Sequence, residues 1–306
     1  MLRDGDGKPI GCDAMADAPT FDLQSHSTYS DGDLPPAHVV ALAAAAGVQL
    51  LALSDHDTVN GVDEAMEAAR SHGIALVPAV EISAPDGAHP DIHVLGYGID
   101  HHDAALLERL AAYRADRDGR ADRMIAKLRE LGFELEESGI QRRVAQGKPV
   151  GRPHIAAAVF AHPANQQRLA DEDLTDPPAV LVAYLIEGQP AFAGRTMPTV
   201  QEAIDVIHAA GGVAIWAHPF WDIKADDAVL ETLDRYVGYG MDGVEAFYTT
   251  HTPHQIQLLA DRAAELDLLT TGSADFHGPE HRHFSRFRAF ELADRVPRLG
   301  SIDPRA

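Results

Sequence analysis

Short apolar runs alternate with amphipathic stretches along most of the chain. Several of the amphipathic stretches end at glycine, which is typical of helix C-termini. Repeated strand–helix units of this length favour a parallel sheet, closed or open. The predicted strands cover 21–23, 50–54, 74–83, 92–99, 213–217, 242–248 and 268–272, and the predicted helices cover 35–46, 62–72, 200–210, 228–237 and 253–266.

Residues 101–190 interrupt this alternation. A long, charged amphipathic pattern at 103–131 is followed by shorter helical pieces with few strand signals. We therefore expect a mostly helical insert at 101–190, between two barrel segments at 19–100 and 191–306. Residues 1–18 lack the apolar core of a secretion signal and are predicted to be a flexible leader.

The length and composition of the chain limit its possible fold class and cellular location. The 306 residues suit one large α/β domain, or a barrel with a smaller insert. No apolar run reaches the roughly 20 residues that cross a bilayer, so no membrane partner is expected. The single cysteine, Cys12, lies in the leader. Disulfides and thiolate metal sites are thereby excluded, and a cytoplasmic location is expected. The oligomeric state stays open.

The net charge of −22 limits the kinds of molecule that this protein is expected to bind. Long nucleic acid binds through cations that neutralise its phosphates, so this acidic chain is not expected to bind it. A small phosphorylated substrate remains compatible, because bound divalent ions can reverse the sign of the charge in a site.

Histidines and carboxylates follow the ends of the predicted strands. In barrels of parallel strands, reactive side chains gather at the C-terminal ends of the strands. Imidazole and carboxylate groups without sulfur suit Zn²⁺, Mn²⁺ or Fe²⁺. One histidine at a strand end is commonly a surface or packing residue, but such residues recur here at successive strand ends: His26 and Asp31, His56, Glu81, His93, His218, and Asp275 and His277. Together they predict a metal centre.

The motifs FDLQSHSTYSDG, LALSDHDTVNG, VPAVEIS, DIHVLGYG, GGVAIWAHP, DGVEAFY and GSADFHG occur in this order between residues 20 and 278. This series resembles the PHP (polymerase and histidinol phosphatase) family, and within it the stand-alone nucleotide phosphoesterase branch with an inserted domain. The resemblance implies a distorted (β/α)7 barrel and a centre of two or three divalent ions. It also implies hydrolysis of small phosphomonoesters such as AMP or nucleoside 3′,5′-bisphosphates.

The resemblance further implies three metal pockets. The first comprises Gln24, His26, Glu81 and Asp275, and Glu81 bridges to a second ion held by His93 and His218. Asp31, His56 and His277 hold the third. Asp55 and Asp57 are expected to orient ligands.

Gln24 departs from the His-x-His opening of the family. Because an amide oxygen is a poorer transition-metal ligand than imidazole, the first pocket is expected to bind its ion loosely, to prefer Mn²⁺ or Mg²⁺, or to stand empty.

Catalysis is expected to use a metal-activated hydroxide, with Asp275, His218 and His154 as the candidate catalytic residues. Arg152 and His154, in a motif that resembles the substrate-contact motif of the branch, are candidates for phosphate binding, and Arg195 is a further one.

Three other functions are compatible with parts of the sequence but are less well supported. A metal-dependent C–N hydrolase would normally carry a carboxylated lysine or a His-x-His start. A weakly active or non-catalytic metal-binding protein is supported by Gln24 alone. A polymerase-linked nuclease is disfavoured because no polymerase segment follows and no basic track could hold a strand.

Overall fold

The computed structural model describes residues 19–87, 89–90, 92–145, 150–194 and 197–305. The predicted leader, with Cys12, and the candidate Arg195 lie outside the described residues.

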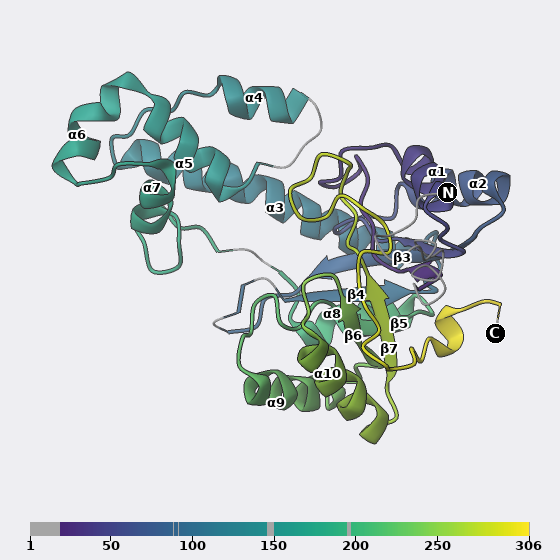
Figure 1. Ribbon diagram of the computed structural model, residues 1–306. Coiled ribbons are helices and arrows are strands. Elements are labelled where there is room, and N and C mark those ends of the chain that lie inside the picture. Colours follow the sequence, from purple (N-terminus) through teal and green to yellow (C-terminus); the bar gives the residue numbers. More distant parts are fainter. Residues whose placement is uncertain (1–18, 88, 91, 146–149, 195–196, 306) are drawn as a thin grey trace, which may run out of the picture.

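A single sheet of seven strands forms the centre of the protein, and its strands follow one another in chain order. The strands are β1 (Phe21–Asp22), β2 (Leu50–Leu53), β3 (Ala75–Ser83), β4 (His93–Tyr97), β5 (Val213–Trp216), β6 (Gly243–Tyr248) and β7 (Leu269–Ser273). Beside β1 and β7, the Leu23 amide donates to the Gly272 carbonyl at 3.1 Å, and the His26 amide donates to the Phe276 carbonyl at 2.8 Å. These bonds bring the first and last strands together, as the predicted distorted barrel requires (Figure 1).

One strand departs from the expected parallel arrangement. The pairs β1–β2, β2–β3, β5–β6 and β6–β7 are parallel, whereas β4 runs antiparallel to both β3 and β5. The link from β3 to β4 is too short for the helical crossover that parallel strands need, which explains the reversal. His93 begins β4 and pairs with Ser83 at the end of β3. Reversal therefore places His93 at the edge where the parallel strands end.

Helices cover the outside of the sheet: α1 (Pro36–Ala45), α2 (Val62–His72), α8 (Val200–Ala209), α9 (Asp226–Val237) and α10 (Pro253–Glu265). Local sequence fixes several of their ends. Thr199 begins α8 with a capping box closed by Glu202, which satisfies backbone donors at the helix start. Gly73 ends α2 with a φ of 69°, a conformation that favours glycine. A short 3₁₀ helix, η3 (Gly300–Ile302), lies near the C-terminus.

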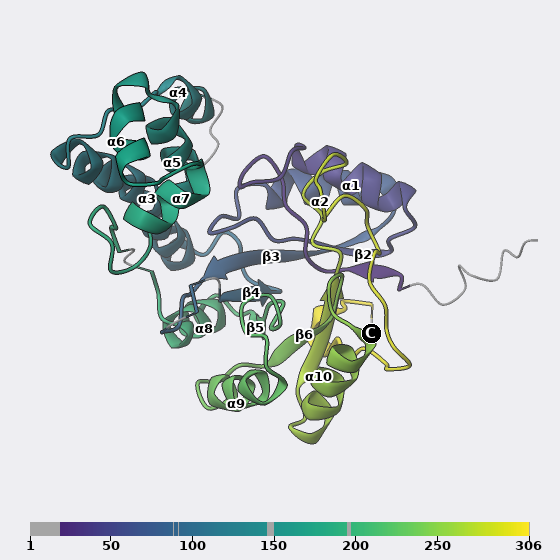
Figure 2. The ribbon, with the colours of Figure 1, turned by 60° about the vertical axis from the view of Figure 1, so that its left-hand side comes forward.

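The segment between β4 and α8 is helical, as predicted. It contains α3 (Ala104–Glu130), α4 (Ser138–Ala145), α5 (Arg152–Ala161), the 3₁₀ helix η2 (Pro163–Asn165), α6 (Gln166–Asp171) and α7 (Pro177–Tyr184). Figures 1 and 2 show α4 to α7 gathered at the far end of α3, away from the sheet.

Two hydrophobic cores meet along α3. Leu106 and Leu110, in its first turns, belong to the core of the barrel. Residues from Ala121 onward belong to a second core, which also includes Ala191 and Ala193. The second core thus extends slightly beyond residue 190, and the insert boundaries at 101 and 190 stay predictions. Among the described residues, no helix has both the length and the apolar character that crossing a bilayer demands.

Candidate metal centre

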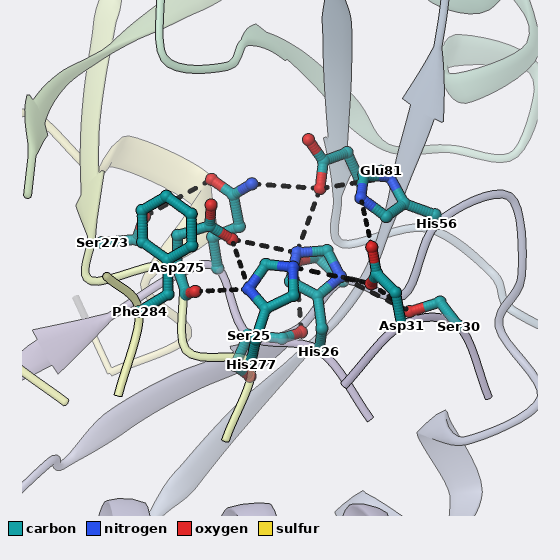
Figure 3. Close-up of polar contacts among 12 residues, drawn as sticks. Ser25, His26, Ser30, Asp31, His56, Glu81, Ser273, Asp275, His277 and Phe284 are labelled. Atoms are coloured by element: carbon teal, nitrogen blue, oxygen red, sulfur yellow. Dashed lines mark hydrogen bonds and ion pairs between the residues drawn. The ribbon is translucent and has the colours of Figure 1, made fainter. Parts of the chain in front are cut away.

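His26 lies in the middle of the cluster of predicted ligands. It follows β1 and is fully buried. Its Nε2 is 3.1 Å from Oε2 of Glu81 and 3.0 Å from Oδ1 of Asp275. Its ring stacks between those of His56 and His277, with centroid distances of 4.6 and 4.3 Å (Figure 3). Residues from four strand ends are thus brought together around one imidazole.

Asp31 lies close to the two other residues of the predicted third pocket. Its carboxylate oxygens lie 3.7 Å from Nε2 of His56 and 3.5 Å from Nε2 of His277. With His26, these residues offer four ligand atoms that lie within 4.8 Å of one another. Burial lowers the pKa of His56 to about 3, so its ring is neutral and able to donate a lone pair.

Glu81 joins this group to the predicted second pocket. Its Oε1 is 2.7 Å from Nδ1 of His93 and 3.1 Å from Nε2 of His218, while its Oε2 faces His26. A carboxylate with its two oxygens turned to different histidine groups has the arrangement of a bridging ligand. Burial by itself would raise the pKa of Glu81, but the imidazole groups packed around it, His56 and His93 first, lower it well below the ordinary value.

Gln24 does not present its oxygen to this cluster. Its Nε2 donates a hydrogen bond to Oε2 of Glu81 at 3.0 Å, and its Oε1 lies 3.4 Å from Oγ of Ser273. The amide nitrogen must face Glu81, because an ionised carboxylate only accepts hydrogen bonds. Gln24 therefore orients the central carboxylate in this structure.

Unpartnered polar atoms show whether the residues fit a metal. Within the described part of the chain, Nε2 of His26, Nδ1 of His56 and Oδ1 of Asp275 are buried without a hydrogen-bond partner. Their close approaches to charged neighbours lack hydrogen-bond alignment. Since buried polar groups are otherwise nearly always satisfied, these converging lone pairs fit divalent cations.

Neighbouring polar groups hold the ligand loops. Asp55 accepts hydrogen bonds from the amide and hydroxyl of Ser27, at 2.7 and 2.6 Å, and from Oγ of Ser30, at 2.6 Å. These bonds fix the loop between His26 and Asp31. Asp57 accepts from the Ser83 amide at 3.3 Å. The expectation that Asp55 and Asp57 orient the ligands agrees with these contacts.

Two further residues, Glu245 and Tyr248 of β6, contact residues of the centre. Glu245 accepts hydrogen bonds from the amide of His218 at 2.9 Å and from Oγ of Ser273 at 2.6 Å. Tyr248 donates its hydroxyl proton to Oδ2 of Asp275 at 2.8 Å. The signal for Glu245 was an acidic residue inside an otherwise apolar strand, whereas nothing in the sequence distinguished Tyr248 from a packing residue.

Two of the candidate ligands have an unusual backbone conformation. His218 and Asp275 have φ values of 30° and 53°, in a region that side chains other than glycine rarely occupy. Such conformations persist where the surrounding structure enforces them, and they are common at functional sites. Here they turn both side chains toward the centre immediately after β5 and β7.

A pocket of about 340 Å³ adjoins the centre on the side of the insert. It is lined by Asp31 together with Arg120, Arg143, Arg152 and His154 of the insert. Nδ1 of His154 accepts a hydrogen bond from the Gly151 amide at 3.0 Å, which leaves the proton of the neutral ring on Nε2. The structure therefore brings two predicted substrate-binding residues close to a predicted metal ligand.

Several other histidines lie outside this cluster, whereas His281 stacks on His277 with a centroid distance of 5.1 Å. His208 and His254 pair with Asp242 and Asp226, respectively. His101 and His102 lie beside Asp63 on the surface.

The fold and the convergent imidazole and carboxylate groups define a metal-dependent hydrolase built on a barrel. The PHP domain model matches residues 22–115. The chain is 35% identical to a 5′-3′ exoribonuclease of Haemophilus influenzae, over 85% of this chain and 90% of that protein. It is 31% identical to a 3′,5′-nucleoside bisphosphate phosphatase of Chromobacterium violaceum, over 85% of this chain and 87% of the relative.

Solved structures are also similar to this chain over most of its length. A structure described as an amidohydrolase from Chromobacterium violaceum, with bound sulfate, matches with a TM-score of 0.69 and 29% identity, covering 90% of this chain and 94% of the other. A Bifidobacterium adolescentis protein assigned as a metal-dependent phosphoesterase matches with a TM-score of 0.66 and 29% identity, covering 87% and 91% of the two chains. The chain belongs to the PHP domain family. It is a metal-dependent phosphoesterase, as the sequence predicted, and the alternative of a C–N hydrolase is not supported.

Proposed function

We propose that this enzyme hydrolyses phosphomonoesters of nucleotides and that nucleoside 3′,5′-bisphosphates are its preferred substrates. The observation on which this rests is the pocket beside Asp31, to which the insert contributes three arginines in a chain of net charge −22. A bisphosphate has one phosphate to be cleaved at the centre and a second to be bound by cations nearby. The name of the Chromobacterium violaceum relative gives the same class of substrate.

Arg152 and His154 would bind the second phosphate. A guanidinium can donate two parallel hydrogen bonds to phosphate oxygens, which gives geometric specificity as well as affinity. Burial lowers the pKa of His154 and the charge of Arg143 lowers it further, so its ring is neutral near pH 7. The proton on Nε2 would then donate to a phosphate oxygen. Arg195 stays a candidate outside the described residues.

Of the nine predicted ligands, all except Gln24 would hold two or three divalent ions: His26, Asp31, His56, Glu81, His93, His218, Asp275 and His277. Imidazole and carboxylate donors suit Mn²⁺, Zn²⁺ or Fe²⁺. When bound, such ions lower the pKa of water and neutralise the phosphoryl oxygens. Because the amide nitrogen of Gln24 faces Glu81, the first pocket retains only His26, Glu81 and Asp275 as protein ligands. We infer that this pocket binds its ion weakly.

Asp275 would accept the proton of the attacking water. Burial by itself would raise its pKa, but the close approach of His26, at 3.0 Å, and the charge of His277 hold that pKa below the ordinary value. The carboxylate is therefore ionised and able to take a proton. Tyr248 restrains its second oxygen, so that Oδ1 stays directed at the centre. His218, whose Nε2 faces Glu81, would act at the same centre.

The test is phosphate release by metal-loaded protein from AMP, from adenosine 3′,5′-bisphosphate and from a phosphodiester. We expect the bisphosphate to give the highest kcat/KM and the activity to vanish in Asp275→Ala. A 5′-phosphorylated oligoribonucleotide belongs in the same series, because the Haemophilus influenzae relative is named an exoribonuclease. Faster cleavage of the oligonucleotide than of every mononucleotide would refute the proposed substrate class.

A further inference from the structure

Trp221 is exposed beside the metal centre, which is unusual for so large an apolar side chain. It is 40% exposed, whereas the only other tryptophan of the chain, Trp216, is fully buried in β5. The Trp221 amide donates to the His218 carbonyl at 2.8 Å, so a tight turn connects it to a candidate ligand. The two rings lie 6.5 Å apart.

The aromatic surface at Trp221 is backed by Phe284, a buried side chain (8% exposed) that lies between Trp221 and the opposite candidate ligands. Its ring centroid is 5.8 Å from that of Trp221 and 5.5 Å from that of His277. His281 stacks on Phe284 at 5.1 Å with an interplanar angle of 11°. The Phe284 carbonyl accepts from the His277 amide at 2.9 Å, and its amide donates to Nδ1 of His281 at 3.1 Å. These bonds fix the loop that carries Phe284.

The aromatic surface and the arginine pocket lie on different sides of the centre. Figure 3 shows Phe284 near Asp275 and His277, with Asp31 on the other side of His26. The pocket of the insert adjoins Asp31. A ligand with a phosphate at the centre could therefore reach cations on one side and aromatic rings on the other.

We propose that the exposed ring of Trp221, supported from behind by the buried Phe284, forms a stacking platform for the nucleobase of the substrate. This inference rests on the proposed function, because it takes the substrate to be a nucleotide. The phosphate of that nucleotide would bind at the metal centre, and its base would lie on the adjoining aromatic surface. Stacking on aromatic rings tolerates every base, since each base has a π-face. The platform therefore predicts a preference for nucleotides over sugar phosphates without selection among bases. A purely structural role, in which Trp221 only covers Phe284, predicts no such preference.

The kinetic test compares AMP with ribose 5-phosphate, which lacks the base. Trp221→Ala should lower kcat/KM for AMP about tenfold more than for ribose 5-phosphate, mainly through KM. Trp221→Phe retains an aromatic ring and should restore most of the difference. An equal effect of Trp221→Ala on both substrates would show that the residue has only a structural role.

Fluorescence gives a second measurement that does not depend on turnover. Adenosine should quench the emission of the wild-type protein, and ribose should not. In Trp221→Phe only the buried Trp216 remains, so the quenching should be lost. Quenching that persists in the variant, or none at saturating adenosine in the wild type, would overturn the platform. If adenosine quenches through Trp221 but neither AMP nor adenosine 3′,5′-bisphosphate releases phosphate, the proposed function fails and the platform stands.

Discussion

The hydroxyl of Tyr248 donates a hydrogen bond of 2.8 Å to Oδ2 of Asp275, while Oδ1 of the same carboxylate faces His26 at 3.0 Å. Both Tyr248 and Asp275 are buried, so water cannot replace the phenol. One oxygen is thus restrained and the other is left for the centre. The orientation of the candidate base depends on a residue from the neighbouring strand β6.

Tyr248→Phe should therefore reduce kcat. Removing a hydrogen bond to a buried charged group costs about 1.5–3 kcal/mol, which corresponds to a loss of roughly tenfold to a hundredfold if Asp275 acts in the transition state. Steady-state kinetics on AMP would measure the loss. Tyr236→Phe is the matched control, because Tyr236 is also buried but bonds Asp86 at 2.9 Å. Equal kcat values for the two variants would contradict the assigned role.

Gln24→His should increase the number of tightly bound ions. The substitution replaces an amide that donates to Glu81 with an imidazole that can ligate. After dialysis against a series of Mn²⁺ concentrations, elemental analysis should find about one more ion per chain in the variant at low free Mn²⁺. If wild type and variant bind the same number with the same affinity, the amide of Gln24 is itself an adequate ligand.

Arg152→Ala should weaken binding of a bisphosphate more than binding of AMP. Loss of a charge-assisted hydrogen bond to phosphate is expected to raise KM for adenosine 3′,5′-bisphosphate by roughly tenfold to a hundredfold, with a smaller change in kcat. Arg262→Ala removes the same charge from α10, where the side chain pairs with Asp234, outside the pocket. A proportional change for both substrates would show that Arg152 does not bind the second phosphate.

His251 should make the stability of the protein sensitive to acid. Burial lowers the pKa of this histidine to about 4, whereas the unfolded chain protonates it near 6.5. The contribution of this neutral histidine to the free energy of unfolding is therefore fully present above pH 6.5. That contribution is lost as the pH falls toward 4. Between pH 7 and pH 5 the loss from this group is about 2 kcal/mol.

Denaturant unfolding of wild type and His251→Asn at the two pH values would measure this contribution. The asparagine amide can replace Nδ1 as donor to the Ala246 carbonyl, which now accepts at 3.0 Å, but it cannot protonate. The variant should lose about 2 kcal/mol less than wild type on going from pH 7 to pH 5. Identical losses would place the acid sensitivity in other groups.

The identity of the candidate ligands could be predicted from the sequence because they occupy the ends of apolar runs. His26, Glu81, His218 and Asp275 each follow or end such a run. A sheet whose parallel strands share one edge brings those positions together regardless of the loops between them. The helical nature of the insert was equally visible, since amphipathic periodicity is a local property.

Only the tertiary structure shows the direction of each strand and the contacts between side chains that are far apart in the sequence. The reversal of β4 places His93 at the ligand edge, where β4 pairs with β5, a strand that follows only after the whole insert. The amide of Gln24 faces Glu81, 57 positions along the chain, so its role as a donor could not be inferred from its identity. Tyr248 has the composition of a core residue, and only packing shows that its hydroxyl reaches Asp275. Local sequence thus determined which groups are available to the centre, whereas long-range packing determined the atom that each of them presents.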